Sequence, residues 1–428
     1  VFVKQKMLTK LMRSVIHENL NSYQYFFPLR FQHKINKTID EVIPPPSEDV
    51  LKFLDSSNEY KEIKKHLPQS LLRKTKIPDT FYLINKNTAS KMAKTIKKHI
   101  DFNSSLIEVN PGLGILTKEL LQYHKKLYLF ETSVYFSQYL NELINNHPEI
   151  ISFKTADFFS ISKLAFKDSL DKGKRVKELL GDLYTNNTDR IVPVVGSVTK
   201  LATLKALIYD VYNNKPNNFG RANFFLIVHP KIYKYLTFAD LSRSKTPTLF
   251  HLVFDYKILE KLPKEHFLPW MPERKPEKGE QNDDNPLYFV NVKLKEEMPC
   301  HLDHLPLLQH FFQTIGPSHR VIPMLEQWIP GCGVWLIADQ DPPGTDRLLG
   351  PGKNDAPLPH MTVFTKFVEL DLAQRLAVFK RFISWPEFEQ CHFKTDVENN
   401  LSKLTLGTDE KVVTNIEDKE ESDTDQDN

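Results

Sequence analysis

The sequence predicts an α/β protein in which a Rossmann-like, doubly wound parallel sheet is followed by a small helical C-terminal domain. The first observation is a short apolar strand that runs through a glycine turn into a helix, within residues 105–117. The second is that strand and helix patterns alternate after this turn, which is typical of a parallel sheet with helices on both faces. The third is a series of helical patterns from about residue 290 onward.

The expected elements follow from the spacing of apolar residues. Short apolar runs predict buried strands, and apolar residues three or four positions apart predict helices, as at Met92, Ile96 and Ile100. The expected strands are residues 105–109, 126–131, 150–155, 190–195 and 222–228. The expected helices are residues 88–100, 135–145, 305–314, 320–328 and 368–382.

Composition divides the chain into six segments. Proline-rich and strongly charged stretches are expected to lie between compact regions, because they favour turns and solvent over a core. The segments are a mitochondrial targeting segment (1–40), an N-terminal extension (41–78), the Rossmann-like domain (79–268), a linker or long loop (269–289), the helical domain (290–395) and a disordered acidic tail (396–428).

The two ends of the chain carry opposite charge. Residues 1–37 contain seven Lys or Arg and one acid, Glu18, which suits a mitochondrial transit peptide or, alternatively, a basic surface helix. Residues 409–428 contain nine acidic and two basic side chains and no aromatic, which predicts a disordered tail. The net charge of +3 therefore hides a body that is more positive by seven charges and suits a polyanionic partner.

Several classes of site are not expected. The three cysteines, Cys300, Cys332 and Cys391, are far apart, so neither a disulfide framework nor a cysteine zinc site is predicted. The histidines have no ligand spacing, and we therefore predict no metal. The longest apolar runs are too short to cross a bilayer, and no membrane insertion is expected.

Three acidic residues stand at the predicted ends of three successive strands. Glu108 ends the strand before the glycine turn, Glu131 ends the next strand, and Asp157 follows the third. The carboxyl ends of parallel strands meet at one edge of a sheet, where ligands bind. We expect Glu131 to accept hydrogen bonds from both ribose hydroxyls and Asp157 from an adenine amino group, with Phe158 against the ring.

The glycine turn distinguishes between two nucleotide ligands. Gly112 and Gly114 allow the backbone to approach a ligand closely, but a dinucleotide site requires a third glycine where this chain has Thr117. The carboxylate of Glu108 would also repel a pyrophosphate, whereas it is compatible with a phosphate-free ligand that carries a sulfonium and an amino acid. We therefore predict S-adenosyl-L-methionine as the cofactor. Each acid taken alone is better explained as an ordinary exposed strand end, but three acids at three successive strand ends favour a ligand site.

These motifs carry a specific resemblance. The run Glu-x-Asn-Pro-Gly-x-Gly-x-Leu-Thr at residues 108–117, then Glu131, then Ala-Asp-Phe-Phe at residues 156–159, resembles the rRNA adenine N6,N6-dimethyltransferase family. The resemblance extends over residues 75–395 and is strongest in the first half. It implies an S-adenosylmethionine-dependent methyltransferase fold and a set of cofactor-binding residues, which are Leu83, Glu108, Asn110, Gly112, Gly114, Glu131, Asp157, Phe158 and Ser197.

Two segments depart from the family pattern. The family's Asn-x-Pro-aromatic loop, which holds a flipped adenine by an amide and a ring, reads Ser197-Val198-Thr199-Lys200 here. Ser197 occupies the Asn position, and the catalytic residue is therefore unknown. The family's Gln-Asn-Phe-Leu segment reads Thr80-Phe81-Tyr82-Leu83, without its two polar residues. We expect cofactor binding to be inherited but weakened.

Two functions are compatible with this pattern. Resemblance to mitochondrial members of the family implies a monomeric transcription initiation factor of the matrix and nucleoid, which assists mitochondrial RNA polymerase in melting promoter DNA. The alternative is an active enzyme that dimethylates adenines in mitochondrial small-subunit rRNA. A small-molecule methyltransferase is disfavoured by the helical domain and the positive body. Aromatics near the fourth and fifth strands could stack on bases or belong to the core: Tyr209, Tyr212, Phe219, Phe224 and Phe225.

Overall fold

The structure, a computed structural model, describes most of the chain after residue 44. The described residues are 45–101, 104–185, 190–213, 219–238, 245–272, 286–316, 318–338, 358 and 360–406. The predicted targeting segment, the acidic tail beyond residue 406 and most of the linker lie outside them. The chain divides into Val1–Glu48 and Asp49–Asn428, and the description below concerns the second unit.

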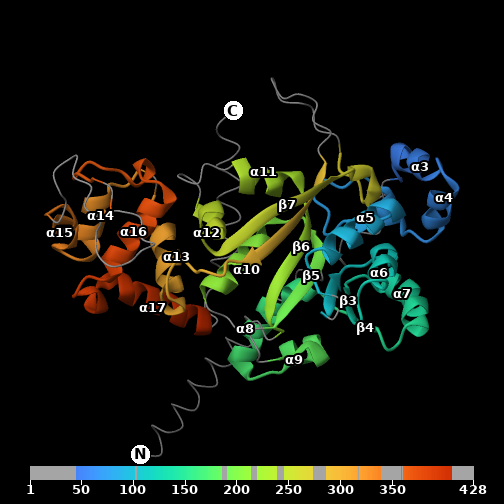
Figure 1. Cartoon of the computed structure of the whole chain (residues 1–428), viewed down its shortest axis with the longest axis horizontal. Helices are drawn as coiled ribbons and strands as arrows, with labels where there is room; N and C mark the ends of the chain where they lie inside the picture. Colours follow the sequence, from blue (N-terminus) through green and yellow to red (C-terminus); the bar gives the residue numbers. More distant parts are fainter. Residues whose placement is uncertain are drawn as a thin grey trace, which may run out of the picture. The chain divides into compact units, whose positions relative to one another are not determined.

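One sheet of seven strands forms the centre of this unit (Figure 1). Its strand order is β4-β3-β2-β5-β6-β9-β7, and β9 runs antiparallel to both of its neighbours while the other paired strands are parallel. The bounds are β2 (Leu106–Val109), β3 (Leu127–Glu131), β4 (Ile151–Thr155), β5 (Ile191–Val198), β6 (Arg221–Val228), β7 (Phe254–Leu262) and β9 (Leu287–Leu294).

The strand order determines where a ligand can bind. From β2 the chain proceeds outward through β3 to β4 and then crosses back to β5 on the other side of β2. The connections after β2 and after β5 therefore leave the sheet in opposite directions, which opens a crevice at the carboxyl ends of these two strands. The three predicted acidic residues lie near the carboxyl ends of β2, β3 and β4, since Glu108 and Glu131 are in the last two residues of β2 and β3 and Asp157 follows β4.

The central strands are apolar because both faces of the sheet are covered. Every residue of β2 and β3 is buried. Alternate side chains enter different clusters, since Tyr128 and Phe130 pack on one face and Leu127 and Leu129 on the other. This alternation is the period of two that a strand imposes on its side chains.

Helices α5, α6 and α7 cover the face that holds Leu127, together with the N-terminal extension. Met92 and Ile96 of α5 are fully buried there, and the Asn85 side chain caps this helix by accepting a hydrogen bond of 2.8 Å from the Thr88 N–H. The bounds are α3 (Glu48–Leu54), α4 (Asn58–Lys65), η1 (Gln69–Leu72), α5 (Lys86–Lys97), α6 (Ile115–Leu120) and α7 (Val134–Asn146).

The opposite face shares its core with the C-terminal helices. Helix α13 contacts α10 and α12, and α17 contacts α8, so one apolar cluster extends from the sheet into the helical region. The bounds are η2 (Phe158–Ser160), α8 (Ile161–Asp171), α9 (Arg175–Leu180), η3 (Gly181–Leu183), α10 (Leu201–Tyr212), α11 (Pro230–Phe238), α12 (Lys245–Val253), α13 (Leu305–Thr314), α14 (Val321–Trp328), α15 (Cys332–Ala338), α16 (Leu372–Ile383) and α17 (His392–Leu406).

The structure corrects two predicted boundaries. The limit between linker and helical domain, at residues 289 and 290, falls inside β9, which is an inner strand of the sheet. The limit between helical domain and tail falls inside α17, where Val397 is still buried. Strand β7 was not predicted, because it lies at the edge of the sheet and places Asp255, Lys257 and Glu260 among its apolar residues.

No helix among the described residues is long and apolar enough to cross a membrane. The aromatics that were candidates for base stacking belong to the core. Tyr212, Phe219 and Phe224 are buried in one cluster, against which Tyr209 packs, and Phe225 is buried in the cluster on the opposite face of the sheet.

An aromatic cluster in the helical region provides a test of the fold. Phe382 is fully buried, with ring centroids 5.4 Å from Trp328 and 5.2 Å from Phe393. Phe382→Ala should lower the free energy of unfolding by about 3–5 kcal/mol, because it removes buried apolar surface and leaves a cavity. Urea unfolding followed by tryptophan fluorescence measures this loss.

The matched control is Val334→Ala, since Val334 is exposed on α15. That substitution should change the free energy of unfolding by no more than about 0.5 kcal/mol. Equal urea midpoints for the two variants would contradict the packing described for Phe382.

Candidate functional site: a crevice at the carboxyl edge of the sheet

The turn after β2 contains three residues with positive φ angles, a conformation that glycine adopts more readily than other residues. Asn110, Gly112 and Gly114 have φ angles of 55°, 60° and 68°. A Cβ atom on Gly112 would lie 2.6 Å from the ring of Tyr82, so no larger residue fits there without a shift. The Asn110 side-chain oxygen accepts hydrogen bonds from the backbone N–H (3.2 Å) and the hydroxyl (3.0 Å) of Thr132, which joins this turn to the end of β3.

Glu108 lies beneath the turn and is buried. Its carboxyl accepts a hydrogen bond of 2.8 Å from the Thr117 hydroxyl of α6. The pKa of Glu108 is raised to about 8, chiefly by desolvation; the Thr117 hydrogen bond opposes this shift, and the nearby charge of Glu131 adds to it. Glu108 is therefore mostly a neutral acid at pH 7, and a cationic ammonium group placed beside it would favour its ionised form.

Glu131, at the end of β3, is fully buried and has three hydrogen-bond donors. The Gly112 N–H donates at 3.0 Å, the Ser133 N–H at 2.8 Å and the Tyr82 hydroxyl at 3.3 Å. Desolvation raises the pKa of Glu131, and these donors oppose the shift because they stabilise the charged form. The carboxylate predicted to hold a ribose is thus in place at the crevice and already hydrogen-bonded.

Asp157 and Phe158 follow β4 and point in different directions. The exposed Asp157 caps the short helix η2, where its carboxylate accepts a hydrogen bond of 3.0 Å from the Phe159 N–H. Phe158 is buried in the core, with ring centroids 5.1 Å from Phe130 and 5.3 Å from Phe219. The ring of Phe158 therefore packs inside the protein, and Asp157 is the member of this pair that faces solvent.

Ser197 is the second-last residue of β5, and its side chain contacts residues 80 and 81. Its hydroxyl oxygen lies 2.7 Å from the Thr80 hydroxyl and accepts a hydrogen bond of 3.0 Å from the Phe81 N–H. Two further contacts follow at the next polar residues along the chain. Thr199 donates to the Asp79 carbonyl at 3.1 Å, and the Lys200 ammonium lies 2.6 Å from the Asp79 carboxylate.

The segment Asp79–Leu83 is fastened at its other end by a short sheet. Strand β1 (Tyr82–Leu83) pairs antiparallel with β8 (Phe267–Leu268), so Leu83 is half-buried beside Phe267. The Ile84 N–H also donates to the His266 carbonyl at 2.9 Å. This pairing was not predicted, because its two strands are two residues long and almost two hundred residues apart, and short strands leave no periodic signal.

The structure thus brings several of the predicted residues together. Gly112 and Glu131 are hydrogen-bonded and both contact Tyr82, Asn110 bonds the adjacent Thr132, and Ser197 joins them through the segment that contains Tyr82. A nucleoside with an amino-acid side arm fits this chemistry. Glu131 offers acceptors for a ribose, Asp157 an acceptor for an amino group, and the glycine turn a close backbone approach.

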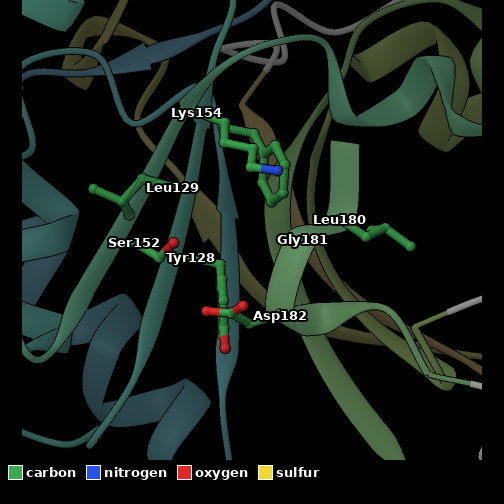
Figure 2. A pocket seen from close by; sticks show the side chains of 8 residues that line it. Tyr128, Leu129, Ser152, Lys154, Leu180, Gly181 and Asp182 are labelled. Carbon is green, nitrogen blue, oxygen red and sulfur yellow. The ribbon is translucent and has the colours of Figure 1, made fainter. Parts of the chain in front are cut away.

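A separate pocket of about 280 Å³ lies between strands β3 and β4 and the segment that contains Leu180 and Asp182 (Figure 2). Figure 2 shows the side chains of Tyr128, Ser152 and Lys154, from β3 and β4, and that of Asp182, from η3, around it. Lys154 donates to the Glu178 carbonyl. The pocket lies before the strand ends, contains none of the predicted site residues, and had no signal in the sequence.

The class of protein follows from the crevice and the strand order. A parallel sheet that contains one antiparallel strand, a glycine turn after the central strand and a carboxylate after the next strand define an S-adenosylmethionine-dependent methyltransferase fold. The prediction of this fold with a helical C-terminal region is confirmed.

The chain is similar to several known proteins. Residues 75–274 match the protein-family model described as ribosomal RNA adenine dimethylase. Dimethyladenosine transferase 2, mitochondrial, of Drosophila melanogaster is 29% identical over 392 residues, which cover 82% of this chain and 86% of the relative. Ribosomal RNA small subunit methyltransferase A of Borreliella burgdorferi (strain ZS7) is 25% identical over 193 residues, 43% of this chain and 64% of the relative.

Among solved structures, the chain is similar to the 23S rRNA methyltransferase ErmE. That similarity has a TM-score of 0.43 at 14% identity and covers 70% of this chain and 99% of the other.

The buried acid Glu108 predicts a pH dependence of stability. Its pKa is about 8 in the folded protein, against an ordinary value of 4.5, so the unfolded chain binds fewer protons between these two values. The free energy of unfolding should therefore fall as the pH rises through this window. Glu108→Gln removes the titrating group, and the urea midpoint of the wild type should fall relative to that of the variant as the pH rises.

The exposed Glu149 provides the control, because Glu149→Gln should keep the pH dependence of the wild type. If the urea midpoints of wild type and Glu108→Gln stayed parallel from pH 5 to pH 8, roughly the window in which linkage acts, the raised pKa of Glu108 would be refuted.

Proposed function

We propose that this protein is a mitochondrial transcription initiation factor, of the kind called mitochondrial transcription factor B, in which the methyltransferase fold holds nucleic acid and methyl transfer is weak or lost. In this proposal it acts in the matrix, in the nucleoid, as a monomer that assists mitochondrial RNA polymerase in melting promoter DNA. Support for the compartment comes from the relative named as mitochondrial. Support for nucleic acid as the partner comes from the family match and the positive body.

The observation that carries this proposal is the internal use of Ser197 and its neighbours. Methylation of a flipped adenine requires a polar group for the amino nitrogen and an aromatic face for the ring. Here the Ser197 hydroxyl contacts Thr80 and the Phe81 N–H, and Lys200 at the aromatic position pairs with Asp79. These residues fasten a neighbouring segment, and none of them presents an amide or a ring to an adenine.

A second observation concerns which parts of the methyltransferase fold are retained and which are replaced. The glycine turn, Glu131 and the seven-stranded sheet are intact, so the departures are confined to the loop after β5 and to the segment that contains Thr80 and Phe81. A protein selected to bind nucleic acid needs a stable scaffold and a charged surface, whereas methyl transfer also needs the amino nitrogen held in line with the sulfonium. The pattern of retained and replaced residues favours binding over transfer.

A reconstituted run-off assay tests the transcription role. With mitochondrial RNA polymerase and a linear promoter template, addition of the protein should raise the promoter-specific transcript well above the polymerase alone. Ser197→Ala and Lys200→Ala should retain this stimulation, because neither residue is assigned to nucleic acid. A premelted template is the control, since it should reduce the requirement for the protein. Equal transcript with and without the protein on the duplex template would reject the transcription role.

The second candidate function is dimethylation of adenines in mitochondrial small-subunit rRNA with S-adenosyl-L-methionine as the methyl donor. It is favoured by the retained glycine turn and by Glu131, which remains at the crevice. The two functions are not mutually exclusive, since one surface could hold either nucleic acid.

Transfer of labelled methyl groups to the small-subunit rRNA hairpin separates the candidates. Our proposal predicts incorporation close to that of Glu131→Ala, the variant that lacks the ribose-binding carboxylate. Robust incorporation by the wild type that Ser197→Ala abolishes would establish the enzyme and would contradict transcription as the sole function.

A further inference from the structure

The side chain of Tyr82 lies at the carboxyl edge of the sheet, between the glycine turn and α7. Its ring packs against Gly112 and against Phe136 of α7, where the ring centroids are 4.7 Å apart. Its hydroxyl donates to one oxygen of Glu131 at 3.3 Å. Tyr82 is buried, so this contact is made away from solvent. The carboxylate expected to bind a ribose is therefore already in contact with a hydroxyl of the protein itself.

The hydrogen-bonding capacity of Glu131 shows what this contact does. A carboxylate has about four acceptor positions, two on each oxygen. The Tyr82 hydroxyl and the Ser133 N–H share one oxygen, and the Gly112 N–H uses the other. A ribose diol requires two positions, and the three donors leave about one. Two of the donors are backbone groups that the fold holds in place, so Tyr82 is the donor that can be exchanged.

The Tyr82 hydroxyl remains a donor under physiological conditions. Burial and the adjacent charge of Glu131 both raise the pKa of Tyr82 above its usual range. Deprotonation therefore does not release the contact, and the side chain must move if Glu131 is to accept a second ribose hydroxyl.

The contacts of the segment Asp79–Leu83 determine how readily Tyr82 moves. On one side Ser197, Thr199 and Lys200 fasten residues 79–81, and on the other side β1 pairs with β8. The polar contacts of Ser197 are buried, which makes them costlier to leave unpaired than the exposed pair of Lys200 and Asp79. Release of Tyr82 thus requires loss of contacts made by the loop after β5.

We propose that Tyr82 is an internal ligand of Glu131, and that a nucleoside with a free ribose diol binds fully in the crevice only when its hydroxyls replace that of Tyr82. The residues that occupy the family's catalytic loop then act as positioning residues, because they hold the segment that carries Tyr82. This inference concerns the crevice alone and does not depend on the transcription role.

Calorimetric titration of S-adenosylhomocysteine into the full chain tests the inference. Tyr82→Phe keeps the ring against Gly112 and removes the competing donor, so it should bind roughly three- to tenfold more tightly than the wild type, the usual worth of one hydrogen bond. Ser197→Ala should also tighten binding, by a smaller factor. Tyr128→Phe is the matched control, since Tyr128 is equally buried on the other face of the sheet and should leave the affinity unchanged.

A second readout follows the segment without any ligand. The Phe81 amide hydrogen, bonded to Ser197, should exchange faster with solvent in Ser197→Ala than in the wild type, and the amide of Ile84, bonded to His266, should not. This measurement separates loosening of the segment from general loss of stability.

Two outcomes would overturn the inference. One is an affinity of Tyr82→Phe equal to or weaker than that of the wild type, and the other is no detectable binding by either. Run-off transcription with the same variants keeps the two proposals apart, because tighter binding by Tyr82→Phe supports the internal ligand whether or not the protein stimulates the polymerase.

Discussion

A carboxylate withdrawn from water must be surrounded by hydrogen-bond donors, and this requirement at Glu131 organises the carboxyl edge of the sheet. Its donors come from three places that are distant in the sequence: the glycine turn after β2, the residue before α7, and strand β1. The positive φ of Gly112 orients its N–H toward the carboxylate, and the same glycine leaves room for the Tyr82 ring. The turn, the helix and the N-terminal segment are therefore placed by one buried group.

The loop after β5 shows how a residue at a strand end can stabilise a neighbouring segment. Ser197 lies near the end of β5, and its partners are the Thr80 hydroxyl and the Phe81 N–H. Because its hydroxyl is short, it reaches these groups directly and joins β5 to the segment Asp79–Leu83. The Ser197 side chain therefore serves the packing of the sheet edge.

Much of the sheet could be predicted, because buried parallel strands are continuous apolar runs. The position of Glu131 could be predicted as well, since strand ends of a parallel sheet share an edge. Strand β7 could not, because charged residues interrupt its pattern, and β9 follows a proline-rich stretch that suggested a loop. The direction of a side chain was also out of reach: Phe158 points into the core because Phe130 and Phe219 surround it, and neither neighbour is near in sequence.

The apolar cluster that joins the sheet to the C-terminal helices has a consequence for the synthesis of the chain. Leu204 and Ile208 of α10 and Phe250 of α12 are buried in the cluster that also contains Leu305 and Leu308 of α13. A ribosome that has completed β9 has made every strand that the structure describes, yet the α10 and α12 surfaces that meet α13 are still uncovered. The nascent chain therefore exposes this apolar surface until α13 has been synthesised, and exposed apolar surface of this kind promotes aggregation.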